Sequence, residues 1–448
     1  MHTITPMLRK SVLAAAILAG LSSHAMAQTA GVQPDSTQAG PTQTGSVQGT
    51  TLSIPTLSGV QMSTVIYGFL NGQLESVQAN GGATPYSTRG RVSDGNSRIG
   101  FRGNIGVSAD LKGVWQIEAA MNNFDQGGVN NRGESATLSS RNTYVGVESV
   151  RFGTFVVGNN DSVYRSLVGS GGALGGNLGM TVRGLDVWNN TSAQVSGNPD
   201  SAFSRGEARY KNSAHYVSPT WYGLQVGGSY GFDEDQGSNT NRSRYSVAAK
   251  YTYGPFAIGA GFDRQNNTGV DTDRLINGFG FRTADVDGAK TDFWKVLGTY
   301  RLPSNTTLGL GYEQGKYGYQ TIAVPTAGNF YVGTIDGKMK QNSVMGSITQ
   351  EFGAATIMAS YAKLGKLEDT TFASPDDFGA KQFSIGATYA LNRFLTPYVY
   401  FTKIRNNAQQ SVNLGQAPIY SNKSGTADAF LAPGDSPRAF GIGMIARF

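Results

Sequence analysis

Apolar and polar residues alternate one by one along most of the chain after residue 62. Between Gln382 and Leu391 every second residue, beginning with Phe383, is on the more apolar side. The chain ends in the same way, with Phe440, Ile442 and further apolar residues separated by glycines and an arginine. Side chains alternate between two faces in a β-strand, whereas an amphipathic helix repeats about every 3.6 residues. The pattern predicts strands with one apolar face and one face of Gly, Ser, Thr, Gln and charged residues.

Sixteen segments carry this alternation, and the connections between them alternate in length. The segments are approximately 62–76, 97–105, 112–123, 139–148, 151–159, 206–217, 223–232, 243–253, 255–264, 290–302, 306–317, 339–352, 354–364, 381–391, 394–404 and 437–448. The long connections include 124–138, 160–205, 265–289, 318–338, 365–380 and 405–436, while the short ones include 254–255, 353 and 392–393. Short turns at one end and long loops at the other are typical of an outer-membrane barrel. We expect an all-β, sixteen-stranded antiparallel transmembrane barrel with long external loops.

A soluble β-sandwich or propeller also shows alternating strands and is the main alternative. Two observations count against it. The polar faces are unlike either face of a packed core, and the apolar faces end in aromatic residues, as the interfacial girdle of a membrane barrel does. These aromatic residues are Tyr67, Phe101, Trp115, Tyr230, Tyr389 and Phe448. Because no water in lipid can satisfy open strand edges, a membrane sheet of this kind must close on itself.

The first 27 residues have the pattern of a secretory signal peptide. Arg9 and Lys10 precede an apolar run at 12–21, and Ala25-Met26-Ala27 provides a small-x-small cleavage site. A transmembrane anchor is the alternative, but the run is about half the roughly 20 residues that a spanning helix needs. Residues 28–58 are rich in Gln, Thr, Gly, Ser and Pro and predict a flexible N-terminal extension. Residues 59–448 form the predicted barrel domain.

Composition argues against catalysis. The chain has no cysteine, which excludes disulfides, thiolate metal sites and a cysteine nucleophile. His215 is the only histidine after the predicted signal peptide, so a catalytic triad or histidine metal site is not expected. No phosphate-binding glycine loop and no basic run indicating nucleic acid is present. We expect no enzyme activity, no cofactor, no metal site and no nucleic-acid partner.

Several strands carry short motifs in a fixed order. They read VIYGFLNGQLE at 65–75, NSRIGFRGN at 96–104, LKGVWQIEA at 111–119, SSRNTYVGVES at 139–149, RFGTFVVGNND at 151–161 and RYKNSAHYVSPTWYGL at 209–224, and the chain ends in phenylalanine. In this order the chain resembles the general-diffusion porins of Gram-negative outer membranes, most closely the beta-proteobacterial type. The matches are confined to the strands. Asn159, Phe69 and Ala446 depart from the residues that the family usually has there, namely arginine, lysine and an aromatic residue.

The resemblance implies a trimeric outer-membrane channel for small hydrophilic solutes, in contact with lipid and lipopolysaccharide. It also implies that the third long connection, 160–205, folds inward with its glycine-rich stretch 169–179; from the sequence alone a surface loop is equally compatible. A substrate-specific channel for sugars or carboxylates remains an alternative, as does a secreted β-sandwich binding protein or adhesin.

The same resemblance assigns residues to the pore. Arginines facing lipid would cost about 2–4 kcal/mol near the midplane, so strand arginines are expected to face the lumen. The expected constriction residues are Arg98, Arg141, Arg209, Glu118, Asp161, Asp186 and Arg183; Arg102, Gln116 and Lys211 are expected to face the lumen, and Phe448 to act as an assembly signal. Acidic residues do not outnumber basic ones in 160–205, and arginines stand opposite. We therefore expect a preference for anions.

Overall fold

The computed structural model describes residues 50–53, 62–82, 85–95, 97–121, 138–169, 206–233, 241–267, 290–317, 321–326, 329–334, 339–369, 374–414, 419 and 431–448. The chain divides into two units, 1–39 and 40–448, and the first lies wholly outside the described residues. The predicted signal peptide therefore stays a prediction. None of the helices in the described part is long and apolar enough to span a membrane.

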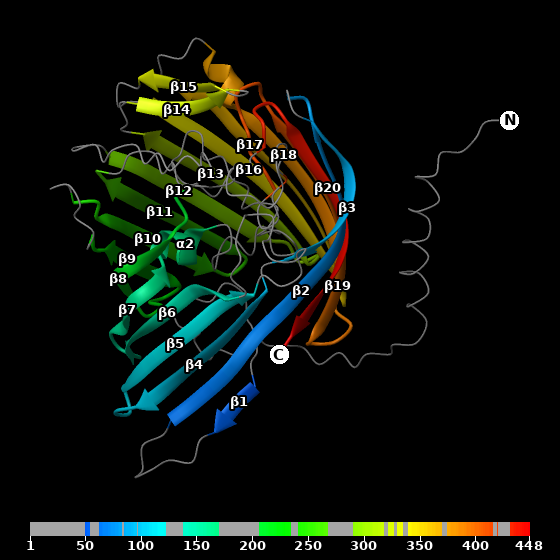
Figure 1. Cartoon of the computed structure of the whole chain (residues 1–448). Helices are drawn as coiled ribbons and strands as arrows, with labels where there is room; N and C mark the ends of the chain where they lie inside the picture. The colour runs from blue at the N-terminus through cyan, green and yellow to red at the C-terminus, as the bar shows by residue number, and fades with distance from the viewer. Residues whose placement is uncertain are drawn as a thin grey trace. The chain divides into compact units, whose positions relative to one another are not determined.

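The described part of the second unit consists almost entirely of strands (Figure 1). Its elements are β1 (Thr50–Ser53), β2 (Met62–Asn80), β3 (Tyr86–Asp94), β4 (Arg98–Gly106), β5 (Leu111–Met121), β6 (Leu138–Ser149), β7 (Gly153–Asp161), α2 (Val163–Val168), β8 (Arg209–Val217), β9 (Leu224–Gly231), β10 (Arg244–Tyr253), β11 (Phe256–Asn266), β12 (Lys290–Arg301), β13 (Thr306–Tyr317), β14 (Thr321–Thr326), β15 (Asn329–Thr334), β16 (Met339–Phe352), β17 (Ala355–Glu368), the 3₁₀ helix η2 (Pro375–Phe378), β18 (Ala380–Tyr389), β19 (Leu395–Asn406) and β20 (Ser436–Arg447).

One sheet of 18 strands closes on itself, because β20 pairs antiparallel with β2 from Phe69 to Asn80. β3 and β4 follow one another along the same side of β2 and together act as a single long strand. With those two counted as one and the short β1 set aside, the barrel has sixteen strands. The sixteen-stranded antiparallel barrel predicted from the alternation is confirmed.

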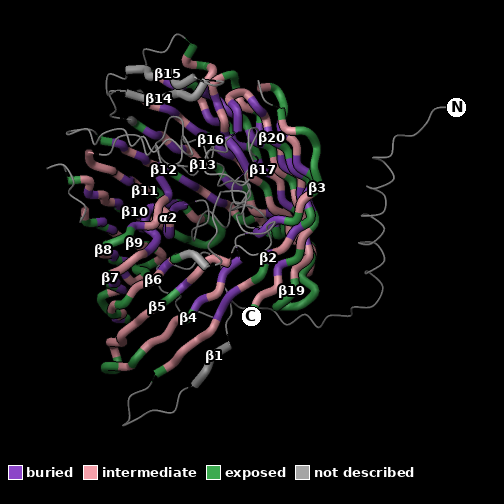
Figure 2. Tube along the Cα trace, in the orientation of Figure 1, coloured by how far each residue is buried: buried purple, intermediate pink, exposed green. Residues whose placement is uncertain are grey.

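The two faces of the barrel differ as the alternation requires, and Figure 2 shows buried and exposed residues alternating along the strands. Leu74 and Ile258 are exposed on the outer face, whereas Glu75 and Asp263 are buried on the inner face. The prediction that Tyr67 belongs to the outer aromatic girdle is wrong. Tyr67 shares the inner face of β2 with Glu75, is buried, and donates a hydrogen bond from its hydroxyl to Glu118. The girdle prediction misplaced it because it ignored which side of the strand Tyr67 occupies.

Two described elements lie in segments where no strand is predicted. β1 falls within the extension 28–58 and pairs with Ser63–Ile66 of β2. β1 and β20 pair with the same edge of β2. Phe448 lies opposite Gly68, and β1 pairs with the residues of β2 that precede Gly68. The rest of 28–58 is outside the described residues. β14 and β15 pair with each other within the long connection 318–338.

Candidate functional site

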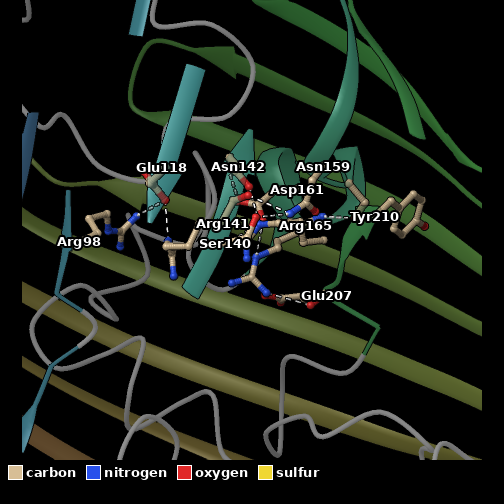
Figure 3. A network of polar contacts seen from close by, with 12 residues as sticks. Arg98, Glu118, Ser140, Arg141, Asn142, Asn159, Asp161, Arg165, Glu207 and Tyr210 are labelled. Atoms are coloured by element: carbon tan, nitrogen blue, oxygen red, sulfur yellow. Dashed lines mark hydrogen bonds and ion pairs between the residues drawn. The ribbon is translucent and has the colours of Figure 1, made fainter. Parts of the chain in front are cut away.

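Two arginines from neighbouring strands share one carboxylate on the inner wall. Arg141 of β6 contacts Oε1 of Glu118 through Nε at 2.5 Å, and Arg98 at the start of β4 reaches the same oxygen through Nη1 at 3.8 Å. The hydroxyl of Tyr67 donates to the other carboxylate oxygen at 2.9 Å. All four side chains are largely buried against the wall. Glu118 therefore positions both guanidinium groups, as Figure 3 shows for Arg98 and Arg141.

A break in register brings Arg141 to this face. β5 and β6 shift register between Ile117 and Ala119, so that Arg141 and Asn142 together stand opposite Glu118. A β-bulge of this kind places two residues against one and redirects their side chains. Strict alternation from Thr143 and Val145, which belong to the outer face, would have turned Arg141 outward.

The second cluster is centred on Asp161 at the end of β7. Its Oδ1 lies 3.1 Å from Nη2 of Arg209 and 3.2 Å from Nε of Arg165. Asn142 links this cluster to the first, because its Nδ2 donates to Asp161 at 3.1 Å while its Oδ1 accepts from Nε of Arg209 at 2.5 Å. The two clusters thus form one continuous row, which we call the arginine row: Arg98, Glu118, Arg141, Asn142, Asp161, Arg165 and Arg209. Figure 3 labels the row from Arg98 to Arg165.

The arginine row carries more positive than negative charge. Its four guanidinium groups face two carboxylates, a formal excess of two positive charges. Guanidinium groups stay protonated at any physiological pH. Because the row lies on the inner wall of a closed barrel, its excess positive charge produces an electrostatic field that acts on ions and charged solutes in the lumen.

The third long connection begins inside the barrel. α2 follows directly after Asp161 and packs its buried residues Val163, Tyr164 and Val168 against the inner face of β8–β12 (Figure 1). Val163 lies close to Gly227, and Tyr164 and Val168 lie close to Gly261, both on the inner face. The described beginning of the connection therefore agrees with the inward path that the resemblance implies. The glycine-rich stretch after Gly169 is outside the described residues.

A fully buried lysine lies beneath α2. Lys295 of β12 contacts Glu207, and its Nζ is 3.0 Å from Oε2 of Glu313 on β13. The same Nζ lies 5.4 Å from the centre of the Tyr164 ring. Glu207 stands just before β8, where the third long connection returns to the wall. Lys295 therefore ties both ends of the described part of this connection, α2 and Glu207, to the barrel.

The remaining predicted pore residues have varied positions. The Arg102 guanidinium lies 4.9 Å from the centre of the Tyr67 ring on the inner face, and Gln116 is buried there and accepts a hydrogen bond from Tyr144. Lys211 is exposed and precedes Asn212, whose φ of 45° marks the register shift between β7 and β8. Because of this shift, the inward position of Ser213 does not predict which face Lys211 or Arg209 occupies. Asp186 and Arg183 lie outside the described residues.

The C-terminal residue closes the seam of the barrel. The backbone N–H of Phe448 donates to the carbonyl of Gly68, and the N–H of Gly68 donates to the carbonyl of Phe448, both at 3.1 Å. These two hydrogen bonds extend the pairing of the first and last barrel strands by one residue. The geometry is compatible with the predicted role of Phe448 in assembly, which stays a prediction.

Sequence reasoning missed several residues of the wall. No motif in the sequence assigns Arg165, Asn142, Lys295 or Glu207 to the lumen wall. Spacing gave no signal for the lysine, because Lys295 and Glu207 are 88 residues apart. The inward position of Tyr67 was predictable, since alternation alone puts Tyr67 on the same side of the strand as Glu75.

A closed antiparallel barrel with an apolar outer face, a charged inner face and a helix folded into its interior is a membrane channel of the outer-membrane type. Comparison with protein families agrees, since residues 14–409 match the Gram-negative porin family. The chain belongs to that family, whose members are channels rather than enzymes.

Individual proteins show the same likeness. An outer membrane porin protein of Bordetella pertussis is 23% identical over 430 residues, which cover 90% of this chain and 95% of the relative. An anion-selective porin from Comamonas acidovorans has a solved structure that superposes with a TM-score of 0.60 at 17% identity, covering 87% of this chain and 100% of that one. An outer membrane protein of Vibrio cholerae, solved in a trimer form, gives a TM-score of 0.56 at 17% identity and covers 86% and 99%.

The protein is therefore an outer-membrane porin of a Gram-negative bacterium. Its barrel forms a water-filled channel through which small hydrophilic solutes and ions diffuse passively. The recognition of the family, the fold class, the channel function and the outer-membrane location expected from the sequence are confirmed.

Proposed function

We propose that the channel prefers anions and that the arginine row is its selectivity filter. The observation that carries this proposal is the excess of guanidinium groups over carboxylates in one continuous row on the lumen wall. Both carboxylates are shared between arginines, so neither presents an isolated negative charge to the pore. A ring or row of fixed positive charge at a narrow point favours anions and repels cations. The solved structure of the anion-selective Comamonas porin is compatible with this preference.

Reversal potentials in a salt gradient across a planar bilayer test the proposal. We expect the native channel to pass more anion than cation. The variant Arg98→Gln/Arg209→Gln should lower the anion preference several-fold, because it removes the excess charge. It leaves one arginine on each carboxylate, Arg141 on Glu118 and Arg165 on Asp161, so no buried carboxylate loses all its partners.

The matched control is Arg151→Gln/Arg393→Gln, which removes the same charge from exposed positions at two short turns. It should keep the native reversal potential. A native channel in which cations carry most of the current would contradict the proposal. Equal shifts in the two double variants would show that total charge, and not the arginine row, sets selectivity.

We further propose that the porin is a homotrimer whose outer surface binds lipopolysaccharide. The trimer form of the Vibrio protein supports the first part. The second is supported by a basic row on the outer face of β17–β19, where Lys363 is directly opposite Lys381 and Lys381 is opposite Arg405. None of these three has an ion-pair partner among the described residues.

The position of the basic row points to phosphate groups of lipid. Like charges directly opposite each other destabilise a sheet unless an anion lies between them. One step nearer the middle of the barrel, Tyr361 stands opposite Phe383 on the same outer face. Aromatic residues mark the membrane interface, so the basic row lies at the level of the headgroups at the end with the long loops.

Native mass spectrometry of the extracted protein tests both parts at once. We expect a three-chain mass with bound lipopolysaccharide. Lys363→Gln/Lys381→Gln/Arg405→Gln should keep the three-chain mass and lose most of the lipopolysaccharide, whereas Arg151→Gln/Arg393→Gln at the opposite end should retain it. A single-chain mass would contradict the trimer, and undiminished lipid on the triple variant would contradict the binding surface.

A further inference from the structure

Part of the lumen-facing wall is covered as completely as a protein core. Val77 of β2, Ile404 of β19 and Ala439 of β20 are at most 1% exposed. Their neighbours Lys403, Arg405 and Phe440 lie on the outer face, so these three residues face the interior. An apolar residue facing an open, water-filled lumen would be exposed. Another part of the chain must therefore cover this wall.

The covering residues come from the last two long connections. Val77, Ile404 and Ala439 belong to one buried apolar cluster that includes Phe378 of η2. Four residues between β19 and β20 belong to the same cluster and are 0–4% exposed: Val412, Leu414, Ile419 and Leu431. The described part of the connection from β19 to β20 is therefore packed against the inner face of the barrel.

Side-chain amides satisfy the backbone of this buried segment. Asn406 donates through Nδ2 to the carbonyls of Val412 and Asp435, at 2.8 and 2.7 Å, and its Oδ1 accepts from the N–H of Val412. Asn413 does the same for Ile419, donating to its carbonyl at 2.6 Å and accepting from its N–H at 3.0 Å. Buried loops are rare because their polar groups lose water, so these substitutes indicate a fixed conformation.

Further hydrogen bonds join the segment to the wall and to its neighbour. The N–H of Gly82, just after β2, donates to Asp435 at 2.8 Å. Gln410 and Gln341 of β16 both donate to the carbonyl of Phe378, at 2.6 and 2.9 Å. The described residues 407–414 and 431–435 are thus held to Gly82 at the end of β2 and to η2, as well as to the strands that they connect, and η2 is held in turn to β16.

We propose that this segment is a second inward-folded element, and that it narrows the outer mouth of the pore and limits the size of the solutes that enter. The third long connection folds against β8–β12, whereas this segment is held to the end of β2, to η2 and to β19 and β20. The two elements therefore reduce the lumen from different walls. The arginine row sets charge preference, and the second element sets an upper size for the solute independently of charge.

The packing is tested first by single cysteines, which are unique probes because the chain contains none. A membrane-impermeant methanethiosulfonate reagent is applied to the assembled porin. Cys at position 412 (Val412→Cys) should react far more slowly than Cys at position 408 (Ala408→Cys), because Val412 is buried and Ala408 is exposed. Equal rates at the two positions would overturn the inward packing.

The effect on the pore is tested by releasing the segment. Val412→Ser/Leu414→Ser weakens its apolar contacts, and Asn406→Ala/Gln410→Ala removes its hydrogen bonds should the first variant fail to assemble. Each should raise single-channel conductance and move the exclusion limit in liposome swelling to larger uncharged sugars, with the reversal potential unchanged. Ala408→Ser is the control and should behave as native.

Release itself is monitored by Ile404→Cys in the variant background, since Ile404 becomes accessible to the reagent only when the segment leaves the wall. Accessible Cys at position 404 together with native conductance and exclusion limit would overturn the narrowing role. The expected result leaves charge selectivity intact, so it is separable from a failure of the proposed anion preference.

Discussion

Replacing Lys295 with methionine is expected to destabilise the barrel by about 3–5 kcal/mol, the usual cost of removing one partner from a buried ion pair. Lys295 is completely buried, as are the side chains of Glu207 and Glu313 that it contacts. Methionine has a similar length and no charge, so it would fill the space but remove the buried ion pairs of Lys295 with the two carboxylates. The loss should appear as a lower midpoint of thermal or denaturant unfolding. The folded fraction is measured from the difference in gel mobility between the folded barrel and the unfolded chain.

The same substitution should also disturb conduction. Glu207 stands where the third long connection returns to the wall, and its backbone carbonyl accepts a hydrogen bond from Nη1 of Arg165 at 2.9 Å. The carbonyl of the preceding Gly206 accepts from Arg244 at 2.8 Å. When Lys295 no longer holds the carboxylate of Glu207, this end of the connection loses its buried ion pair. We expect frequent fluctuations of the open-channel current in Lys295→Met.

Two comparisons isolate the charge effect. Lys250→Met also removes a lysine from the inner face, but Lys250 has no carboxylate partner among the described residues, so its stability should stay near native. Lys295→Met/Glu207→Gln/Glu313→Gln also removes the two buried negative charges and should recover much of the loss. If Lys295→Met is as stable as the native porin, or if the triple variant is the weakest of the set, the ion-pair explanation is wrong.

The fold was predictable because a barrel strand repeats the same local rule many times. Each strand needs an apolar side for lipid and a polar side for the lumen, and this alternation agrees with the inner-wall positions that the family resemblance assigns to Arg98 and Glu118. The rule fails where register changes. Arg141 and Lys211 adjoin such changes, and a shift by one residue reverses the face of a side chain.

The contacts that complete the site depend on residues far apart in the chain. Lys295 meets Glu207 and Glu313 only after the barrel has closed, and no spacing in the sequence records this meeting. The inward packing of Val412 was equally hidden. The connection that contains it resembles any other long loop, because its apolar residues follow no strand or helix period. Alternation therefore predicts the wall, whereas the elements that narrow the lumen require the structure.

Gly100→Val is expected to weaken both stability and anion preference. A Cβ at Gly100 would lie 2.4 Å from Cζ of Tyr67 and 2.6 Å from its hydroxyl oxygen, far inside contact distance. The ring would have to leave the wall, and its hydrogen bond to Glu118 would be lost. Inserting bulk into a well-packed site usually costs about 1–3 kcal/mol. Because Glu118 positions Arg98 and Arg141, the reversal potential should move toward that of the Arg98→Gln/Arg209→Gln variant.

Gly100, one of the 61 glycines of the chain, thus contributes to the filter, since the absence of a side chain leaves room for the Tyr67 ring beside it. Gly113→Val on β5 is the matched control, because the nearest atom to its Cβ would be 3.9 Å away, and it should be near native in both measurements. Combining Gly100→Val with Tyr67→Leu relieves the clash and should restore stability. It should leave the reversal potential shifted, because leucine cannot donate to Glu118. A double variant that restores both properties would mean that the Tyr67 hydroxyl has no part in positioning the arginine row.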